Sequence, residues 1–200
     1  MDLLARLMRT FRAEHPQVTF RIVSDLAENV VEQINRGLLD FGLLLRLNST
    51  WGLHGIRLPT DERVVVLMRT DSPLARLEAV TLDDLATQPV LLPSSYQKSG
   101  LTGTARPKEE GGTLEVVAYF DMPYNASRMV QAGLGCAVTL AGLIEGSEEV
   151  HLAVRPLDVA VDMPSYLAWK PFQQRTRACA AFLEVAQATF GGHGSESAIG

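Results

Sequence analysis

Side chains that could bind a carboxylate follow two strands that the sequence predicts to be buried. Ser94 and Ser95 come directly after the apolar run 89–93, and the segment 122–125 follows the run 114–120. Hydroxyl groups and free backbone N–H groups at a strand end can bind a carboxylate. The segment 122–125 also precedes a predicted helix, whose N-terminal dipole favours an anion. These residues predict a site that binds a small anion without transforming it.

The same residue types are also common in ordinary turns and helix caps, so spacing alone leaves both interpretations open. Two further polar residues, Arg46 and Asn48, follow a predicted strand in the first part of the chain. They would lie on the opposite wall if the chain formed a cleft. Ligand binding is therefore a hypothesis that the positions of the strands must support.

No motif for catalysis or cofactor binding is present in the sequence. It contains no G-x-S-x-G, H-E-x-x-H, C-x-x-C or P-loop pattern. The segment 133–135, Gly-Leu-Gly, follows a predicted helix and precedes a strand, which is the reverse of the order that binds a dinucleotide phosphate. The four histidines are scattered along the chain, at His15, His54, His151 and His193. We therefore expect no catalytic residue, no metal site and no cofactor.

Composition excludes several other classes. The chain has 200 residues, a formal net charge of −5 and no run of Lys or Arg, which argues against direct binding to nucleic acid. No apolar run approaches the roughly 20 residues of a membrane span. The N-terminus lacks the features of a signal peptide. Cys136 and Cys179 lie in apolar patterns and are expected to be reduced, buried thiols. We therefore expect a cytoplasmic protein that does not contact a membrane.

Two β-α-β patterns organise the chain. In the first, Val18, Phe20 and Ile22 alternate with polar residues and predict a strand, and a helix follows with Ser24 or Asp25 as its N-cap. The apolar run 41–45 then predicts a strand buried on both faces. The second pattern, residues 114–140, has a strand, a helix that starts near 123, and a second strand. Two such units predict an α/β fold with two lobes, whose ligand lies beyond the carboxyl ends of the strands.

The remaining segments fit around these two units. Helical spacing predicts an opening helix whose apolar stripe runs from residue 3 to 11 and which ends at His15-Pro16. It also predicts a closing helix whose apolar face runs from 178 to 190. The segment 94–112 is predicted to be a loop or an irregular short helix, and 191–200 a disordered tail. Further strands are predicted at 55–58, 63–68, 89–93, 150–154 and 166–169.

Six pieces of sequence resemble, in their order and spacing, the effector-binding domain of LysR-type transcriptional regulators. They are FRAEHPQVTFRIVSD, VVEQINRGLLDFGLLL, GIRLPTDERVVVLMRTDSPLA, TLDDLATQPVLLP, MVQAGLGCAVTL and SYLAWKPFQQRTRACAAFLEVA. The resemblance covers most of residues 3–190. It implies two Rossmann-like lobes of the periplasmic-binding-protein type with a ligand cleft between them. Lobe I would comprise residues 1–69 and 165–190, and lobe II residues 70–164.

The resemblance also implies which residues bind the effector. The polar strand end corresponds to Ser94 and Ser95, and the loop facing it to Met122, Pro123, Tyr124 and Asn125. The strand at the floor of the pocket corresponds to Val138 and Thr139. The first lobe contributes Arg46 and Leu47. The helix 26–36, with the strand before it, matches the face that pairs in the family's homodimers and homotetramers.

Two parts of the family pattern have no counterpart in this sequence. The first is the N-terminal winged helix-turn-helix with its linker helix. The second is the first strand of the domain, since the opening helix of this sequence matches the helix that normally follows that strand. The resemblance therefore implies that DNA is contacted only through a helix-turn-helix outside this chain. The segment 94–112 also lacks the family's regular helix.

Our leading interpretation is a ligand-sensing domain of a transcription regulator. A small molecule, a carboxylate or similar anion, would bind between the lobes and change the geometry of the oligomer. The alternative is a free-standing solute-binding protein of a transporter, against which the missing export signal argues. An enzyme is a third class, and no nucleophile–base arrangement supports it.

Overall fold

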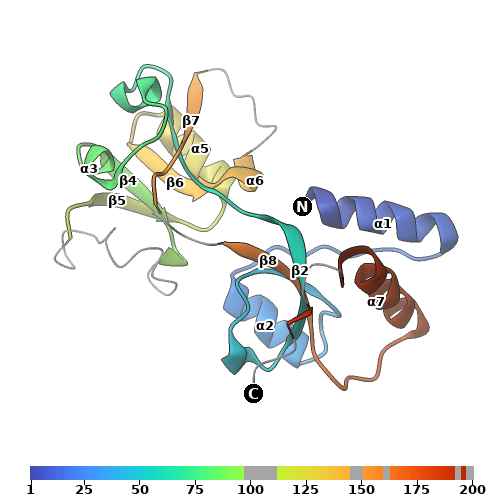
Figure 1. The fold of residues 1–200 in the computed structure, drawn as a ribbon. Helices are drawn as coiled ribbons and strands as arrows, with labels where there is room; N and C mark the ends of the chain where they lie inside the picture. The colour runs from blue at the N-terminus through green and yellow to red at the C-terminus, as the bar shows by residue number, and fades with distance from the viewer. Residues whose placement is uncertain (97–111, 145–150, 160–162, 192–194, 197–200) are drawn as a thin grey trace. The chain divides into compact units, whose positions relative to one another are not determined.

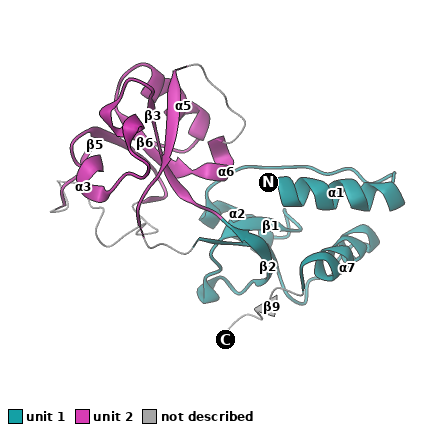
Figure 2. Cartoon of the chain, turned by 45° about the horizontal axis from the view of Figure 1, so that its top comes forward, with its two compact units in different colours: residues 1–61, 163–200 teal, residues 62–162 magenta. Residues whose placement is uncertain are grey.

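The computed structural model describes residues 1–96, 112–144, 151–159, 163–191 and 195–196. The chain forms two compact units, unit 1 from residues 1–61 and 163–200 and unit 2 from residues 62–162 (Figure 2). The chain therefore passes from unit 1 to unit 2 after residue 61, whereas the expected end of the first segment of lobe I is residue 69. The reason is that the next strand, residues 64–69, pairs among the described strands with those of unit 2 alone. No helix in the described part of the chain is long and apolar enough to cross a membrane.

Unit 1 contains an antiparallel sheet with helices on both faces (Figure 1). Its strands, in sheet order, are β1 (Gly42–Leu45), β8 (Pro164–Trp169), β2 (His54–Asp61) and β9 (Ser195–Glu196). Its helices are α1 (Asp2–Glu14), α2 (Ala27–Asn35), the 3-10 turn η1 (Ser49–Trp51) and α7 (Arg177–Phe190). β9 lies within the expected disordered tail, most of which falls outside the described residues.

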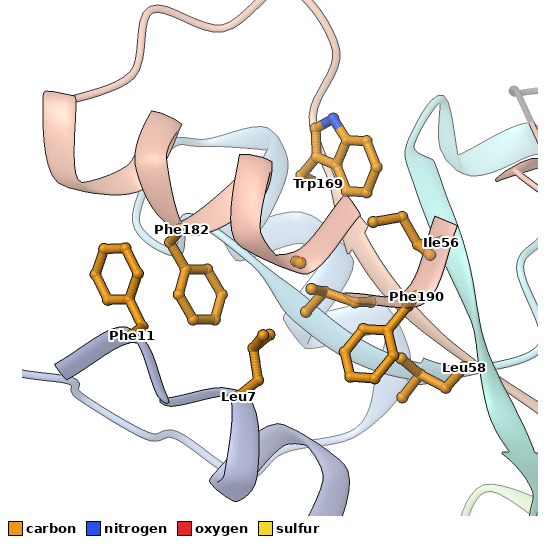
Figure 3. Packing of buried hydrophobic residues seen from close by; sticks show 9 residues of the cluster. Leu7, Phe11, Ile56, Leu58, Trp169, Phe182 and Phe190 are labelled. Carbon is orange, nitrogen blue, oxygen red and sulfur yellow. The ribbon is translucent and has the colours of Figure 1, made fainter. Parts of the chain in front are cut away.

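Two apolar clusters hold unit 1 together. On one face of the sheet α1 and α7 bury Leu7, Phe11 and Phe182 against strand residues (Figure 3). The Phe182 ring lies 5.3 Å from that of Phe11 and 5.2 Å from that of Phe41, measured between centroids. On the other face α2 buries Ile34 and its neighbours against β1. The helical spacing of apolar residues in α1, α2 and α7 therefore predicted their buried faces correctly.

The strand predicted at residues 18–22 is wrong, and so is the first β-α-β unit that depends on it. The segment has no regular secondary structure and no described strand pairs with it, and β1 pairs with β8 alone among the described strands. Phe20 nevertheless packs against Phe182, with the ring centroids 5.5 Å apart. Alternation here reflects packing of one side of the segment, without a ladder of hydrogen bonds. The N-cap of α2 is Leu26, and Leu43 in β1 is exposed, so neither the predicted cap nor the fully buried strand is confirmed.

Unit 2 contains a mixed sheet. Its strands, in sheet order, are β5 (Glu115–Phe120), β4 (Pro89–Pro93), β6 (Cys136–Leu140), β3 (Val64–Arg69) and β7 (Leu152–Pro156). The other elements are the 3-10 turn η2 (Pro73–Arg76), α3 (Leu82–Leu85), α5 (Pro123–Gln131) and α6 (Ala141–Ile144). β4 runs parallel to both β5 and β6, whereas β3 runs antiparallel to β6 and β7. The second predicted β-α-β unit is therefore confirmed as β5-α5-β6.

Helix α5 covers one face of this sheet. Its buried residues Ala126 and Val130 pack with Val65 and Ala137 of the sheet. Thr81 caps α3 through a reciprocal pair of hydrogen bonds with Asp84. The predicted loop at 94–112 falls mainly outside the described residues.

Candidate functional site

The carboxyl ends of three parallel strands meet at one edge of the sheet of unit 2. β4 lies between β5 and β6 and is parallel to both, so all three end on the same side. The backbone N–H of Ser94 donates to the carbonyl of Phe120 at 2.8 Å, which joins the ends of β4 and β5. We call this side the carboxyl edge of unit 2. The predicted residues Ser94, Ser95 and Thr139 and the segment 122–125 all lie there.

The first turn of α5 leaves a hydrogen-bond donor free at this edge. Met122 is the N-cap residue and makes no side-chain cap, and Pro123 at the next position has no N–H to donate. The N–H groups of Asn125 and Ala126 both donate to the Met122 carbonyl, at 3.0 and 3.3 Å. The Tyr124 N–H has no acceptor among the described residues. It therefore remains available to an anion at the positive end of the helix dipole.

Thr139 places a buried hydroxyl at the same edge. It is only 3% exposed. Its register partner Val65 and its strand neighbour Ala137 both belong to the cluster under α5, so Thr139 shares that face of the sheet. No described residue bonds its hydroxyl. A buried polar group without a partner costs about 1–3 kcal/mol. This hydroxyl is thus a group that a ligand could satisfy.

The other predicted residues of unit 2 differ in their suitability. Val138 is buried and points to the opposite face of the sheet from Thr139, because successive residues of a strand alternate. The side chains of Val138 and Thr139 therefore lie on different faces of the sheet, and both residues stay predicted contacts. The side chains of Ser94 and Asn125 have no bonded partner among the described residues, whereas Ser95 already takes part in an interaction. Met122 and Tyr124 expose large side chains.

Arg46 and Leu47 belong to unit 1. Arg46 adopts a left-handed conformation, with φ of 54°, and its N–H donates to the Pro164 carbonyl at 2.8 Å. Leu47 is partly buried and packs against the cluster under α2. Its side chain therefore contributes to the core of unit 1, which the resemblance alone did not indicate.

The carboxyl edge also carries acidic groups. Asp121 is exposed between β5 and α5. The Glu62 carboxylate accepts from the Gly142 N–H at 3.2 Å and so caps α6. These carboxylates offset the positive N-terminal dipoles of α5 and α6. An anion at this edge must therefore be held by directed hydrogen bonds more than by net positive charge. The edge therefore has the donors and acceptors to bind a carboxylate that also carries hydroxyl groups.

A small cavity lies at the opposite edge of the same sheet, and sequence reasoning missed it. Its volume is about 170 Å³, and Arg69, Asp71, Gln88 and Cys136 are among its lining residues. The Arg69 guanidinium donates two hydrogen bonds to the Asp71 carboxylate, at 2.9 and 2.6 Å. This pairing raises the pKa of Arg69 and lowers that of Asp71. Burial raises the pKa of the Cys136 thiol to about 11, so it stays protonated at neutral pH. Because Arg69 is already paired with Asp71, this cavity is a weaker candidate for an anion site than the carboxyl edge of unit 2.

Comparison with known proteins identifies the family. Residues 1–191 match the model of the LysR substrate binding domain, and the chain belongs to that family. An uncharacterized HTH-type transcriptional regulator, YvbU of Bacillus subtilis (strain 168), is 28% identical over 190 residues, which are 94% of this chain and 63% of the regulator. The chain thus spans less than two thirds of that relative.

Solved structures share the fold. The effector binding domain of QuiR in complex with shikimate superposes with a TM-score of 0.77 at 16% identity, covering 95% of this chain and 91% of that one. The BenM effector binding domain with its effector benzoate gives a TM-score of 0.68 at 21% identity, covering 98% and 89%. The predicted family and its two-lobed, periplasmic-binding-protein-like fold are therefore confirmed. At these identities the comparisons establish the fold and leave the choice of ligand open.

Proposed function

We propose that this chain is the ligand-sensing domain of a LysR-type DNA-binding transcriptional regulator, acting in the cytoplasm. It binds a small carboxylate without transforming it, and DNA is contacted through a helix-turn-helix that these 200 residues do not include. The observation that carries the proposal is the buried hydroxyl of Thr139, which has no described partner and shares one sheet edge with the free N–H of Tyr124. Buried polar groups are normally bonded, so an unpaired one at a strand end favours a ligand site.

The proposed site uses the donors of the carboxyl edge. The Tyr124 N–H and the hydroxyls of Ser94 and Thr139 would donate to the ligand carboxylate. The Asn125 amide would accept from or donate to a ligand hydroxyl. Ser95, Met122, Pro123 and Val138, and Arg46 and Leu47 of unit 1, remain predicted contacts on the resemblance alone. Shikimate and benzoate, the carboxylates bound by QuiR and BenM, have the chemistry that this donor set fits.

A thermal-shift panel tests this proposal. Benzoate and shikimate are compared with their uncharged amides at the same concentration. We expect at least one carboxylate to raise the melting temperature, because a ligand that binds only the folded state stabilises it. The matching amide should have a much smaller effect. Stabilisation by the amides alone, or turnover of any compound in the panel, would contradict the proposal.

We further propose that the chain self-associates through exposed apolar side chains. Ile22 and Val23 lie just before α2, on the segment that the resemblance places at the dimer face, and both are exposed. On the edge strand β5, Val117 and Tyr119 are exposed on one side. Apolar groups on an edge strand favour association.

Sedimentation velocity tests the self-association. We expect Tyr119→Glu to shift the protein toward the monomer, because a charge would then be buried in the contact. Leu143→Glu is the control, since Leu143 is similarly exposed on α6 and outside both surfaces. If both variants sediment as the unmodified protein does, the proposed contact is wrong.

A further inference from the structure

One aromatic side chain of unit 1 is fully exposed in an unfavourable backbone conformation. Phe172 lies in the loop between β8 and α7, is 100% exposed and has φ of 54°. The left-handed region disfavours bulky side chains, and exposure of a phenyl ring to water is unfavourable as well. Two unfavourable features at one residue persist only when the surrounding structure holds them in place.

The loop that carries Phe172 is held by specific contacts. The Lys170 ammonium donates to the Asn35 carbonyl at the end of α2, at 2.7 Å. The Arg175 guanidinium donates to the Lys170 carbonyl, also at 2.7 Å. The rings of Phe172 and His54 are arranged edge to face, with their centroids 6.4 Å apart. The outward position of Phe172 is therefore a feature of an anchored loop.

A second exposed apolar side chain accompanies it. Leu38 is 57% exposed and follows Gly37 in the turn after α2. A Cβ at Gly37 would lie 3.1 Å from the side-chain nitrogen of Gln173, so this turn packs against the Phe172 loop. We call Leu38 and Phe172, with the charged residues of segments 32–40 and 170–177, the Phe172 patch.

Cations outnumber carboxylates in the two segments that form the patch, residues 32–40 and 170–177. The cations are Arg36, Lys170, Arg175 and Arg177, against Glu32 and Asp40. Glu32 pairs with Arg36 at 3.4 Å, which leaves three cations against Asp40. Arg177, at the start of α7, has no bonded partner among the described residues. The chain as a whole carries a net charge of −5, so this local excess is of the opposite sign. Aromatic residues and arginine are the types most enriched in the energetic centres of interfaces.

We propose that the Phe172 patch docks an acidic segment of another protein, with Phe172 as the apolar anchor. The partner would present an aliphatic side chain flanked by Asp or Glu, as an acidic amphipathic helix does. Charge complementarity decides between this occupant and a second copy of the chain. Two copies meeting patch to patch would bring like charges together, which is unfavourable.

Binding of a defined peptide to the full chain tests the proposal. The probe is a fluorescein-labelled helix of Leu, Ala and Glu, about 18 residues or five turns long. Its counterpart has Lys in place of each Glu. We expect the acidic peptide alone to bind, as measured by fluorescence anisotropy. Its affinity should fall when salt rises from about 50 to about 300 mM, because screening weakens exposed charges.

Three variants identify the surface. Phe172→Asn should weaken binding about tenfold or more, and Asn tolerates the left-handed conformation, so folding is retained. Arg177→Glu should weaken binding most at low salt. Leu143→Asn changes a leucine of unit 2 that is about as exposed as Leu38, and this variant should bind as the unmodified chain does. Equal binding of the Lys peptide, unchanged binding by Phe172→Asn, or dimers that Phe172→Asn abolishes without peptide would each overturn the proposal.

Discussion

Gly135→Ala is expected to destabilise unit 2 by about 3 kcal/mol, a large value for overpacking in a core. Gly135 precedes β6, where the backbone passes directly over that of Pro89 at the start of β4. A Cβ at Gly135 would overlap the Pro89 carbonyl oxygen and lie 3.2 Å from Leu91. The obstacle is backbone within a paired strand, so the structure cannot move it without breaking the contact between β4 and β6.

Gly133→Ala is the matched control. Gly133 also has a positive φ, of 84°, but a Cβ there meets nothing within 4 Å. It should therefore cost only the conformational penalty, about 1–2 kcal/mol. Amide hydrogen exchange in β3, β4 and β6 measures the opening of unit 2. Tryptophan fluorescence is unsuitable, because Trp51 and Trp169 both lie in unit 1. Equal losses for the two variants would show that the close approach to Pro89 is not what requires glycine.

Thr139→Val is expected to change ligand affinity and stability in opposite directions. Removing the unpaired hydroxyl should raise the stability of unit 2 by about 1 kcal/mol, since a buried donor without a partner is costly. The same change removes a donor from the proposed site. We expect the affinity for a carboxylate that stabilises the unmodified protein to fall about tenfold or more, which corresponds to at least about 1.4 kcal/mol.

Two further variants separate the hydroxyl from general effects of substitution. Thr139→Ser keeps the hydroxyl and should keep most of the affinity. Thr113→Val changes an exposed threonine of unit 2 and should alter neither property. Isothermal titration calorimetry measures the affinity, and hydrogen exchange measures the stability. Unchanged affinity in Thr139→Val would remove this residue from the site, and a loss of stability would show that its hydroxyl already has a partner.

The sequence predicted the elements whose burial follows from local pattern. The apolar run of β3 is buried along Val64–Met68, and the stripe of α5 faces the sheet. It failed at residues 18–22, where alternation arises because Val18 and Phe20 pack on an aromatic cluster. Whether an extended segment becomes a strand depends on a neighbouring backbone, and local sequence carries no information about that neighbour.

The site was predictable in part. The strand–turn order placed Ser94 and Asn125 at one edge, because parallel strands end together. The opposite orientations of Val138 and Thr139 required the register of β6 against β3. The unpaired state of the Thr139 hydroxyl required the complete set of its neighbours. The cavity beside Arg69 gave no signal, since it combines residues from 68–89 with residues from 133–136.

The most direct test of the proposed carboxylate site is an amide chemical-shift titration of the full chain. The ligand is a carboxylate that the thermal-shift panel has shown to stabilise the protein. The proposed site predicts that, within unit 2, the largest shifts fall on the N–H groups of Tyr124, Ser94 and Thr139. Shifts centred on Arg69, Gln88 and Cys136, at the opposite edge of the sheet, would place the ligand elsewhere and contradict the account.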